Sequence, residues 1–280
     1  MTTEQPRVAL VTGANQGLGL ALVEELANRL WPADIVYLTG RNADRIATAL
    51  AGLPPGRAQV RTEVLDVADG SSVDRVAAEL AARHGGVDIV FGNAVMRMTP
   101  DDDPAKIIDE YVDVNNLGTT RVLRAFAPLL RDNGRLIIVA SSLGRLRYLA
   151  PVLHDRFLRP GTLDEVDDVV RAWRDAILDG SATIGSWPGF INIPSKIAQV
   201  AAVRTLARTR RAADLDRGVL IAATCPGLLD TPTSSVWFDM SRAATPAQGA
   251  VALVDLALAP VDPAQYGELV QDGEVLPFGP

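Results

Sequence analysis

Residues 12–19 read Thr-Gly-Ala-Asn-Gln-Gly-Leu-Gly and lie between an apolar run at 7–12 and a segment at 17–30 whose apolar residues recur at helical spacing. The three glycines, Gly13, Gly17 and Gly19, therefore fall at the turn between a predicted strand and a predicted helix. Glycine lets the backbone approach a diphosphate closely, and the start of a helix offers free amides and a dipole that favours an anion. We interpret this turn as a dinucleotide site, with a plain glycine-rich turn as the alternative, because a lone glycine motif is weak.

The alternation of strand and helix continues along the first half of the chain. Short apolar runs predict strands at 34–39, 58–65, 87–91 and 135–140, and helical spacing predicts helices at 42–51, 70–84 and 106–130. Apolar strands that alternate with helices indicate a parallel sheet covered on both faces. The predicted fold class is α/β, a Rossmann-like doubly wound parallel sheet, with residues 1–280 forming a single domain.

The alternation stops between Leu143 and Trp187, where Arg- and Asp-rich residues predict one or two amphipathic helices and no strand. We interpret residues from about 145 to 190 as an insertion within the domain. Trp173 and Trp187 suggest a lid over an apolar substrate, although tryptophan more often belongs to a core. The remaining pattern predicts helices at 194–213 and 246–258, strands at 218–224 and 267–271, and an extended tail at 275–280.

Composition narrows the classes of partner. The 280 residues carry a net charge of −7 and contain no long basic run, which argues against nucleic acid and against an anionic membrane as partners. Cys225 is the only cysteine, so no internal disulfide and no thiolate metal cluster can form, and we expect a reduced, cytoplasmic setting. The first six residues, MTTEQP, lack the features of a signal peptide, and no apolar stretch is long enough to span a membrane. We expect a small-molecule substrate and no metal.

The chain resembles the short-chain dehydrogenase/reductase family, whose glycine pattern is TGxxxGxG. Further matches occur in the family's order over nearly the whole chain: Asp66-Val67, Gly92-Asn93-Ala94-Val95 in place of NNAG, Asn115 in VNNLGT, Ser141-Ser142, and Pro226-Gly227 with Thr231. The long segment before Lys196 resembles the carbonyl-reductase branch. There, such an insertion covers the surface that other members use to form tetramers, so the resemblance implies a monomer.

The resemblance also implies roles in binding a dinucleotide. The phosphates and the adenosine ribose would contact Gly13, Asn15, Gln16, Gly17, Leu18 and Gly19. The adenine would contact Asp66 and Val67. The nicotinamide and its ribose would contact Asn93, Ala94, Lys196, Pro226, Gly227, Leu229 and Thr231. Gly40 stands where an NAD-preferring member carries an acid, and Arg41 follows it. A guanidinium there pairs with a 2′-phosphate, so we predict NADP(H) rather than NAD(H), with a solvated surface charge as the alternative role of Arg41.

The catalytic residues implied by the resemblance are Ser142, Lys196 and Asn115, together with position 192, where the family's YxxxK motif has tyrosine and this chain has Asn192. In the family the phenol protonates the substrate oxygen, the lysine lowers the phenol pKa, and the helical asparagine supports a water relay. An amide only donates and accepts hydrogen bonds near neutral pH, so ordinary carbonyl reduction should be slow. A second departure is Val95, which replaces the last glycine of NNAG and crowds the backbone near the nicotinamide.

Three explanations of Asn192 stay open. Another residue delivers the proton: among Tyr37, Tyr111, Tyr148 and Tyr266 we place only Tyr148 near the substrate, and His154 is a weaker candidate. For Tyr148 and His154, packing at the surface or in a lid is the favoured alternative. Alternatively, conjugation in the substrate stabilises the product oxyanion, and no strong acid is needed. The third is that the pocket serves non-redox chemistry, such as a lyase, isomerase or cyclase reaction, or binds NADP(H) without turnover. A structural role is compatible with each, because Asn192 suits a helix N-cap and Pro194 suits a first helical turn. We predict an atypical NADP(H)-dependent reductase of a carbonyl or conjugated carbonyl in a small organic molecule.

Overall fold

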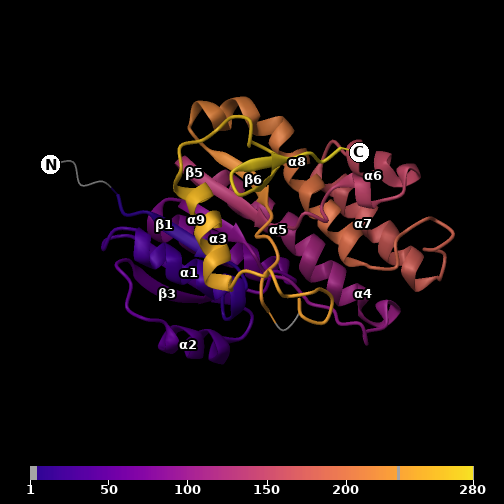
Figure 1. Ribbon diagram of the computed structural model, residues 1–280. Helices are drawn as coiled ribbons and strands as arrows, with labels where there is room; N and C mark the ends of the chain where they lie inside the picture. The colour runs from indigo at the N-terminus through magenta and orange to yellow at the C-terminus, as the bar shows by residue number, and fades with distance from the viewer. Residues whose placement is uncertain (1–4, 232–233, 280) are drawn as a thin grey trace.

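The computed structural model describes residues 5–231 and 234–279, which form an eight-stranded sheet flanked by helices (Figure 1). The strands are β1 (Val8–Val11), β2 (Ile35–Gly40), β3 (Gln59–Val64), β4 (Val87–Gly92), β5 (Leu130–Val139), β6 (Leu220–Thr224), β7 (Leu269–Gln271) and β8 (Glu274–Leu276). Their order in the sheet is β3-β2-β1-β4-β5-β6-β7-β8, and every neighbouring pair except β7 and β8 is parallel. The predicted doubly wound parallel sheet is confirmed.

The carboxyl end of the chain differs from the prediction of an extended tail. Residues 274–276 form β8, which pairs antiparallel with β7 and places Leu276 opposite Leu269. The turn between them uses Asp272 and Gly273, both with positive φ, at 51° and 81°. Asp and Gly tolerate this conformation, so a tight hairpin forms where a three-residue strand is too short to give a period-two pattern.

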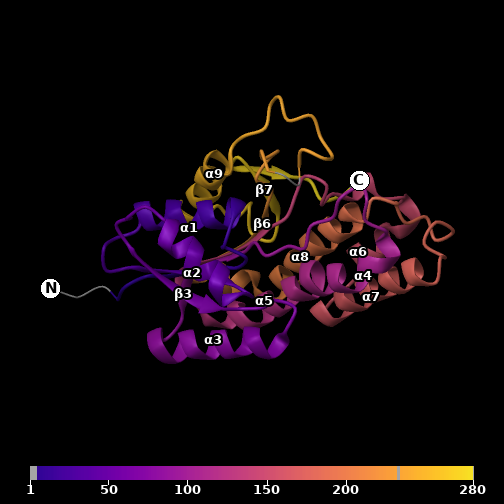
Figure 2. The same cartoon turned by 90° about the horizontal axis from the view of Figure 1, so that it is seen from below.

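The helices cover both faces of the sheet. They are α1 (Gly17–Arg29), α2 (Ala43–Gly52), α3 (Gly70–His84), α4 (Pro104–Val112), α5 (Gly118–Phe126), α6 (His154–Leu158), α7 (Leu163–Leu178), α8 (Asn192–Asp216) and α9 (Pro246–Leu258). Figure 2 shows α1 and α9 on one face and α3 and α5 on the other, and α8 packs beside α5. The buried residues of β1, Val8 to Val11, lie between these layers, at the centre of the core.

The predicted single helix at 106–130 is interrupted. Helix α4 ends at Val112, a π-helix occupies Asp113–Leu117, α5 follows, and a 3₁₀ turn at Ala127–Leu129 leads into β5. The π-helical turn contains Asn115, whose backbone carbonyl accepts hydrogen bonds from the side chains of Thr119 and Gln199. These bonds satisfy a carbonyl within a wide turn, and such turns are frequent at functional sites.

The segment predicted as a helical insertion contains α6 and α7, and α7 packs against α4 and α8 (Figure 1). The N-cap of α7 is Thr162, whose hydroxyl accepts a hydrogen bond from the Glu165 amide. Trp173 and Trp187 are buried and in ring contact at 6.1 Å. Both residues therefore belong to the core of this segment.

Candidate active site

A cavity of about 880 Å³ lies at the carboxyl ends of the parallel strands, where open α/β sheets bind their ligands. Its walls come from the loops that follow β1 to β6 and from the start of α8. The residues predicted for the site that line it are Gly13, Asn15, Gln16, Leu18, Gly19, Arg41, Asp66, Val67, Asn93, Ala94, Ser142, Asn192, Lys196, Pro226, Gly227, Leu229 and Thr231. The fold therefore brings nearly the whole predicted set together around one cavity.

Two predicted residues do not line this cavity. Gly17 lies at the first position of α1 with φ +57°. Asn115 is buried, and its side chain accepts a hydrogen bond from the Met96 amide and donates one to the Met96 carbonyl. Asn115 thus holds the loop after β4, and its backbone carbonyl accepts hydrogen bonds from Thr119 and Gln199.

The turn after β1 fits a diphosphate. Gly13 has φ +61°, and a Cβ there would stand 2.7 Å from the Cα of Ala94. A Cβ on Gly19 would stand 2.5 Å from Nδ2 of Asn93, so neither position accepts a side chain. The first turn of α1 has no acidic residue and no side-chain cap from Gln16, which leaves its amides open to an anion.

Basic side chains gather at the end of β2. Arg41 and Arg45 line the cavity beside Gly40, and no carboxylate occupies the position of Gly40. Between the arginines, Asn42 caps α2 by accepting a hydrogen bond from the Arg45 amide, so the start of that helix also faces the cavity. The sequence interpretation identified Arg41 and missed Arg45, which lies in the first turn of α2.

Arg97, in the loop after β4, was also missed. Its Nη2 would lie 3.4 Å from a Cβ on Gly17, so the guanidinium stands over the glycine turn and lines the cavity. Among the described residues it has no hydrogen-bond or ion-pair partner. An unpaired cation beside an open helix start is suited to a phosphate.

Lys196 lies on the wall of the cavity, one helical turn beyond Asn192. Its Nζ donates hydrogen bonds to Oε1 of Gln199 at 2.8 Å and to the carbonyl of Val139 at 3.3 Å. Burial lowers the pKa of Lys196 to about 8, and the nearby thiol of Cys225 opposes that shift. A lysine in this position is a cation near neutral pH that readily changes its protonation state.

Gln199 connects Lys196 to Asn115. Its Nε2 donates to the carbonyl of Asn115 at 2.9 Å and to the hydroxyl of Thr119 at 3.0 Å, while its Oε1 accepts from Lys196. A side-chain amide therefore lies between the lysine and Asn115, the asparagine that the resemblance assigns to a water relay. An amide does not exchange protons as water does near neutral pH.

Asn192 differs from the prediction of an N-cap. It is the first residue of α8, the cap position is Ile191, and no side chain caps the helix. Its Oδ1 accepts a hydrogen bond from the hydroxyl of Tyr111 at 3.1 Å. Burial raises the pKa of Tyr111 to about 12, while interactions with Asn115 and Ser195 oppose the shift, so this phenol stays protonated.

The prediction that Tyr148 is the tyrosine near the substrate is wrong. Tyr148 is exposed, and its hydroxyl accepts hydrogen bonds from Arg147 and Arg145. His154 bonds to the carbonyl of Leu149, and neither residue lines the cavity. The tyrosine beside position 192 is Tyr111, 81 residues away in the sequence. Trp173 and Trp187 do not line the cavity either, so the interpretation of these two as a lid is wrong.

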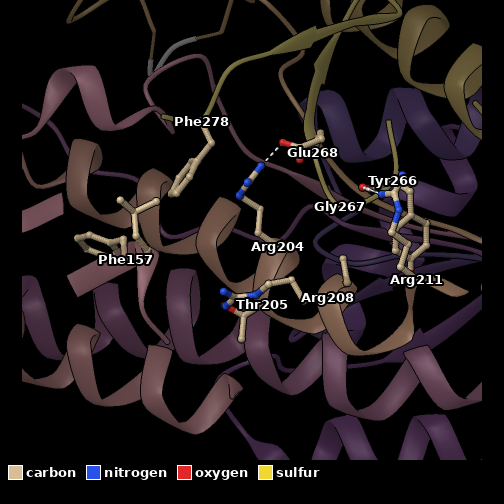
Figure 3. Close-up of a pocket in the computed structure, with 11 residues that line it drawn as sticks. Phe157, Arg204, Thr205, Arg208, Arg211, Tyr266, Gly267, Glu268 and Phe278 are labelled. Atoms are coloured by element: carbon tan, nitrogen blue, oxygen red, sulfur yellow. Dashed lines mark hydrogen bonds and ion pairs between the residues drawn. The ribbon is translucent and has the colours of Figure 1, made fainter. Parts of the chain in front are cut away.

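A smaller cavity of about 140 Å³ lies between α8, α6 and the carboxyl-terminal segment (Figure 3). Its arginines are engaged with neighbouring groups: Arg204 with Glu268, Arg208 with the carbonyl of Pro160, and Arg211 with the carbonyls of Tyr266 and Pro263. Phe278 stacks on Arg204. This cavity marks the place where α8 anchors the end of the chain.

The described residues contain no group of His, Cys, Asp and Glu side chains that could hold a metal ion. No helix among them is long and apolar enough to span a membrane.

Comparisons with known proteins agree with this geometry. Residues 7–152 match the family model of the short chain dehydrogenases. The chain is 30% identical to mouse (Mus musculus) carbonyl reductase (NADPH) 1 over 99% of this chain and 100% of that protein. It is 31% identical to mouse carbonyl reductase (NADPH) 3 over 95% and 96% of the two chains. The solved structure of menthone neomenthol reductase from Mentha piperita has a TM-score of 0.76 at 24% identity and covers 96% of this chain and 99% of that one. The chain therefore belongs to the short-chain dehydrogenase family.

Proposed function

We propose that the protein is an NADP(H)-dependent reductase of a carbonyl or conjugated carbonyl in a small organic molecule, with an atypical proton-transfer position at Asn192. The observation that carries the proposal is that one cavity holds the open glycine turn, the two arginines after β2, and the pair Ser142 and Lys196. The two mouse relatives, both named as NADPH reductases, support the choice of cofactor.

The cavity fits the proposed nucleotide along its length. The turn at Gly13 and the start of α1 would hold the diphosphate, Arg41 and Arg45 the 2′-phosphate, and Lys196 the nicotinamide ribose. When bound, NADPH supplies a hydride. The protein itself must then bind the acceptor, orient its oxygen and exclude water.

At the reacting end, the substrate oxygen meets hydrogen-bond donors. Ser142 and Asn192 both line the cavity, and the hydroxyl of Ser142 has no hydrogen-bond partner among the described residues. Both groups donate to an oxygen that gains negative charge, and the Lys196 cation adds electrostatic stabilisation. None of this supplies a strong acid, which is why simple ketones should react slowly.

The lining of the cavity favours an apolar substrate. Val95, Met96, Leu143 and Phe238 contribute apolar surface around the donors. Trp237 lies in the segment between β6 and α9, and its Nε1 donates a hydrogen bond to the Met98 carbonyl in the loop after β4. Its ring centroid lies 4.8 Å from that of Phe190. These contacts enclose a site suited to a compact hydrophobic carbonyl compound.

The proposal is tested by following NADPH absorbance with a panel of ketones, quinones and enones while products are identified. We expect stoichiometric NADPH oxidation with at least one conjugated carbonyl. Product formation without NADPH oxidation would favour the non-redox alternative. NADPH-dependent thermal stabilisation without any turnover would favour a binding protein, since a ligand of the folded state raises the melting temperature.

The low pKa of Lys196 predicts how cofactor affinity depends on pH. NADPH is negatively charged, so its binding favours the protonated lysine and raises the lysine pKa above its free value of about 8. The complex then holds more protons than the free protein above pH 8, and affinity must fall as pH rises through that range, by at most ~10-fold per pH unit. Fluorescence titrations from pH 6.5 to 9.5 check this. Lys196→Met should bind more weakly with a flat profile, and an unchanged slope in that variant would contradict the assignment.

We also propose that the protein is a cytoplasmic monomer. The support for a monomer is that α7 packs against α4 and α8, and that its buried Asp167 carboxylate accepts hydrogen bonds from Thr120 and Arg124 of α5. Because these buried hydrogen bonds hold α7 in place, α7 covers a surface of the domain that would otherwise be free to contact another subunit. Sedimentation equilibrium would show a mass near 29.8 kDa, and a tetramer would contradict the proposal.

A further inference from the structure

The side chain of Asn192 has one engaged end and one free end. Its Oδ1 accepts the proton of Tyr111 at 3.1 Å. Its Nδ2 has no hydrogen-bond partner among the described residues. Among those residues, the buried side-chain nitrogen and oxygen atoms without a partner are Arg135 Nε and Trp173 Nε1. Nδ2 of Asn192 is therefore accessible to solvent. Asn192 lines the cavity, and because its oxygen is bonded to Tyr111, Nδ2 is the end of the amide that is left to meet a ligand there.

Tyr111 is built to donate. Its ring is buried on α4, its hydroxyl reaches the start of α8, and its pKa of about 12 keeps the proton in place over the whole physiological range. In the structure the Tyr111 proton meets the oxygen of the Asn192 amide, and this arrangement turns the amide nitrogen away from the phenol. Tyr111 therefore determines which end of Asn192 meets the substrate.

We infer that Tyr111 is a positioning residue that directs Nδ2 of Asn192 toward a substrate oxyanion, an inference that rests on the function proposed above. The substrates of such a site are α,β-unsaturated ketones or aldehydes, which are reduced at their carbon–carbon double bond. A neutral amide stabilises an oxyanion and does not protonate it. An alkoxide formed from a simple ketone concentrates its charge on one oxygen and needs a proton there. An enolate shares its charge with the α-carbon and does not.

The reaction balances without an acid at position 192. The β-carbon of the substrate accepts a hydride from NADPH, which is oxidised to NADP⁺, and the pair of electrons of the C=C bond shifts to form the enolate. Ser142 and Asn192 hold the enolate oxygen. A proton from water then adds to the α-carbon and gives the saturated ketone or aldehyde.

The inference is tested with a double-mutant cycle of Tyr111→Phe and Asn192→Ala, using 4-nitrophenolate as an oxyanion probe in the presence of NADP⁺ and its absorbance as the readout. Tyr111→Phe should weaken phenolate binding ~10-fold in the native background and leave it unchanged in the Asn192→Ala background. An equal loss in both backgrounds would show a merely structural role and overturn the inference. Tyr148→Phe, at an exposed tyrosine outside the cavity, is the matched control and should change nothing.

Asn192→Asp separates the two ends of the amide. The carboxylate still accepts the Tyr111 hydrogen bond, so the melting temperature should be close to that of the native protein, while phenolate binding should fall more than ~10-fold. Undiminished phenolate binding in this variant would contradict a donor role for Nδ2.

Turnover of 2-cyclohexenone with NADPH then tests the substrate class. We expect cyclohexanone, with kcat reduced ~10-fold by Tyr111→Phe at unchanged NADPH affinity; the allylic alcohol as product would overturn the choice of C=C reduction. The phenolate experiment measures binding and needs no turnover. It therefore tests the role of Tyr111 even if the protein proves to reduce no carbonyl compound.

Discussion

Asn192→Tyr is expected to raise the rate of reduction of unconjugated ketones by ~10²- to 10⁴-fold, the usual contribution of a positioned general acid. Position 192 lies one helical turn before Lys196, so the introduced phenol and the lysine cation share a face of α8. The cation lowers the phenol pKa, and Ser142 already lines the same cavity. Initial rates of NADPH oxidation with cyclohexanone measure the gain.

Asn192→Phe is the matched control, because it adds a ring of similar volume without a hydroxyl. It should show no gain over the native protein. If the tyrosine and phenylalanine variants reduce cyclohexanone equally slowly, proton transfer does not limit the reaction and the account of position 192 is wrong. Both variants lack the amide oxygen that accepts the Tyr111 hydrogen bond, so the two differ only in the hydroxyl at position 192.

The double substitution Arg41→Ala with Arg45→Ala should raise the Kd of NADPH ~100-fold and change that of NADH less than ~2-fold. The two guanidinium groups lie beside Gly40, where only the 2′-phosphate distinguishes the two nucleotides. Charge-assisted hydrogen bonds to a phosphate account for an effect of this size. Arg41 also pairs with Glu110 at 3.0 Å on the surface, so Glu110→Gln should strengthen NADPH binding slightly by freeing the arginine.

Arg97→Ala provides the contrast within the same experiment. Arg97 stands over the glycine turn, and the diphosphate is common to both nucleotides, so this variant should weaken NADPH and NADH alike, by ~10-fold. Arg171→Ala removes an exposed arginine of α7 that pairs with Asp168, and it should change neither affinity. Equal loss of both nucleotides in the Arg41 and Arg45 variant would contradict selection of the 2′-phosphate.

Much of the fold and the cavity followed from the sequence for one physical reason. In a parallel doubly wound sheet the carboxyl ends of all strands meet at one edge, so motifs at the ends of predicted strands must converge. This brought Gly13, Asn93 and Ser142 together from strands far apart in the chain. The spacing of four residues between positions 192 and 196 likewise placed Asn192 and Lys196 on the same wall.

The missed features depend on contacts that spacing does not encode. Tyr111 meets Asn192 only because α4 and α8 converge on the same π-helical turn, and no local pattern connects residues 81 apart. The π-helix itself was read as ordinary helix, since one wide turn barely disturbs the apolar period. Gln199 was within reach of sequence reasoning, because a residue three places after Lys196 faces the same way. The catalytic and cofactor roles of the individual residues stay predictions.

We propose that Asn192 separates cofactor binding from proton delivery in a site that still transfers hydride. The most direct test of this proposal is a reaction with NADPH deuterated at the transferred position of C4, with 2-cyclohexenone as acceptor and mass spectrometry of the product. We expect one deuterium on the β-carbon of cyclohexanone and one NADP⁺ per product. A product without deuterium, formed while the NADPH remains unchanged, would contradict it and assign the nucleotide a structural role.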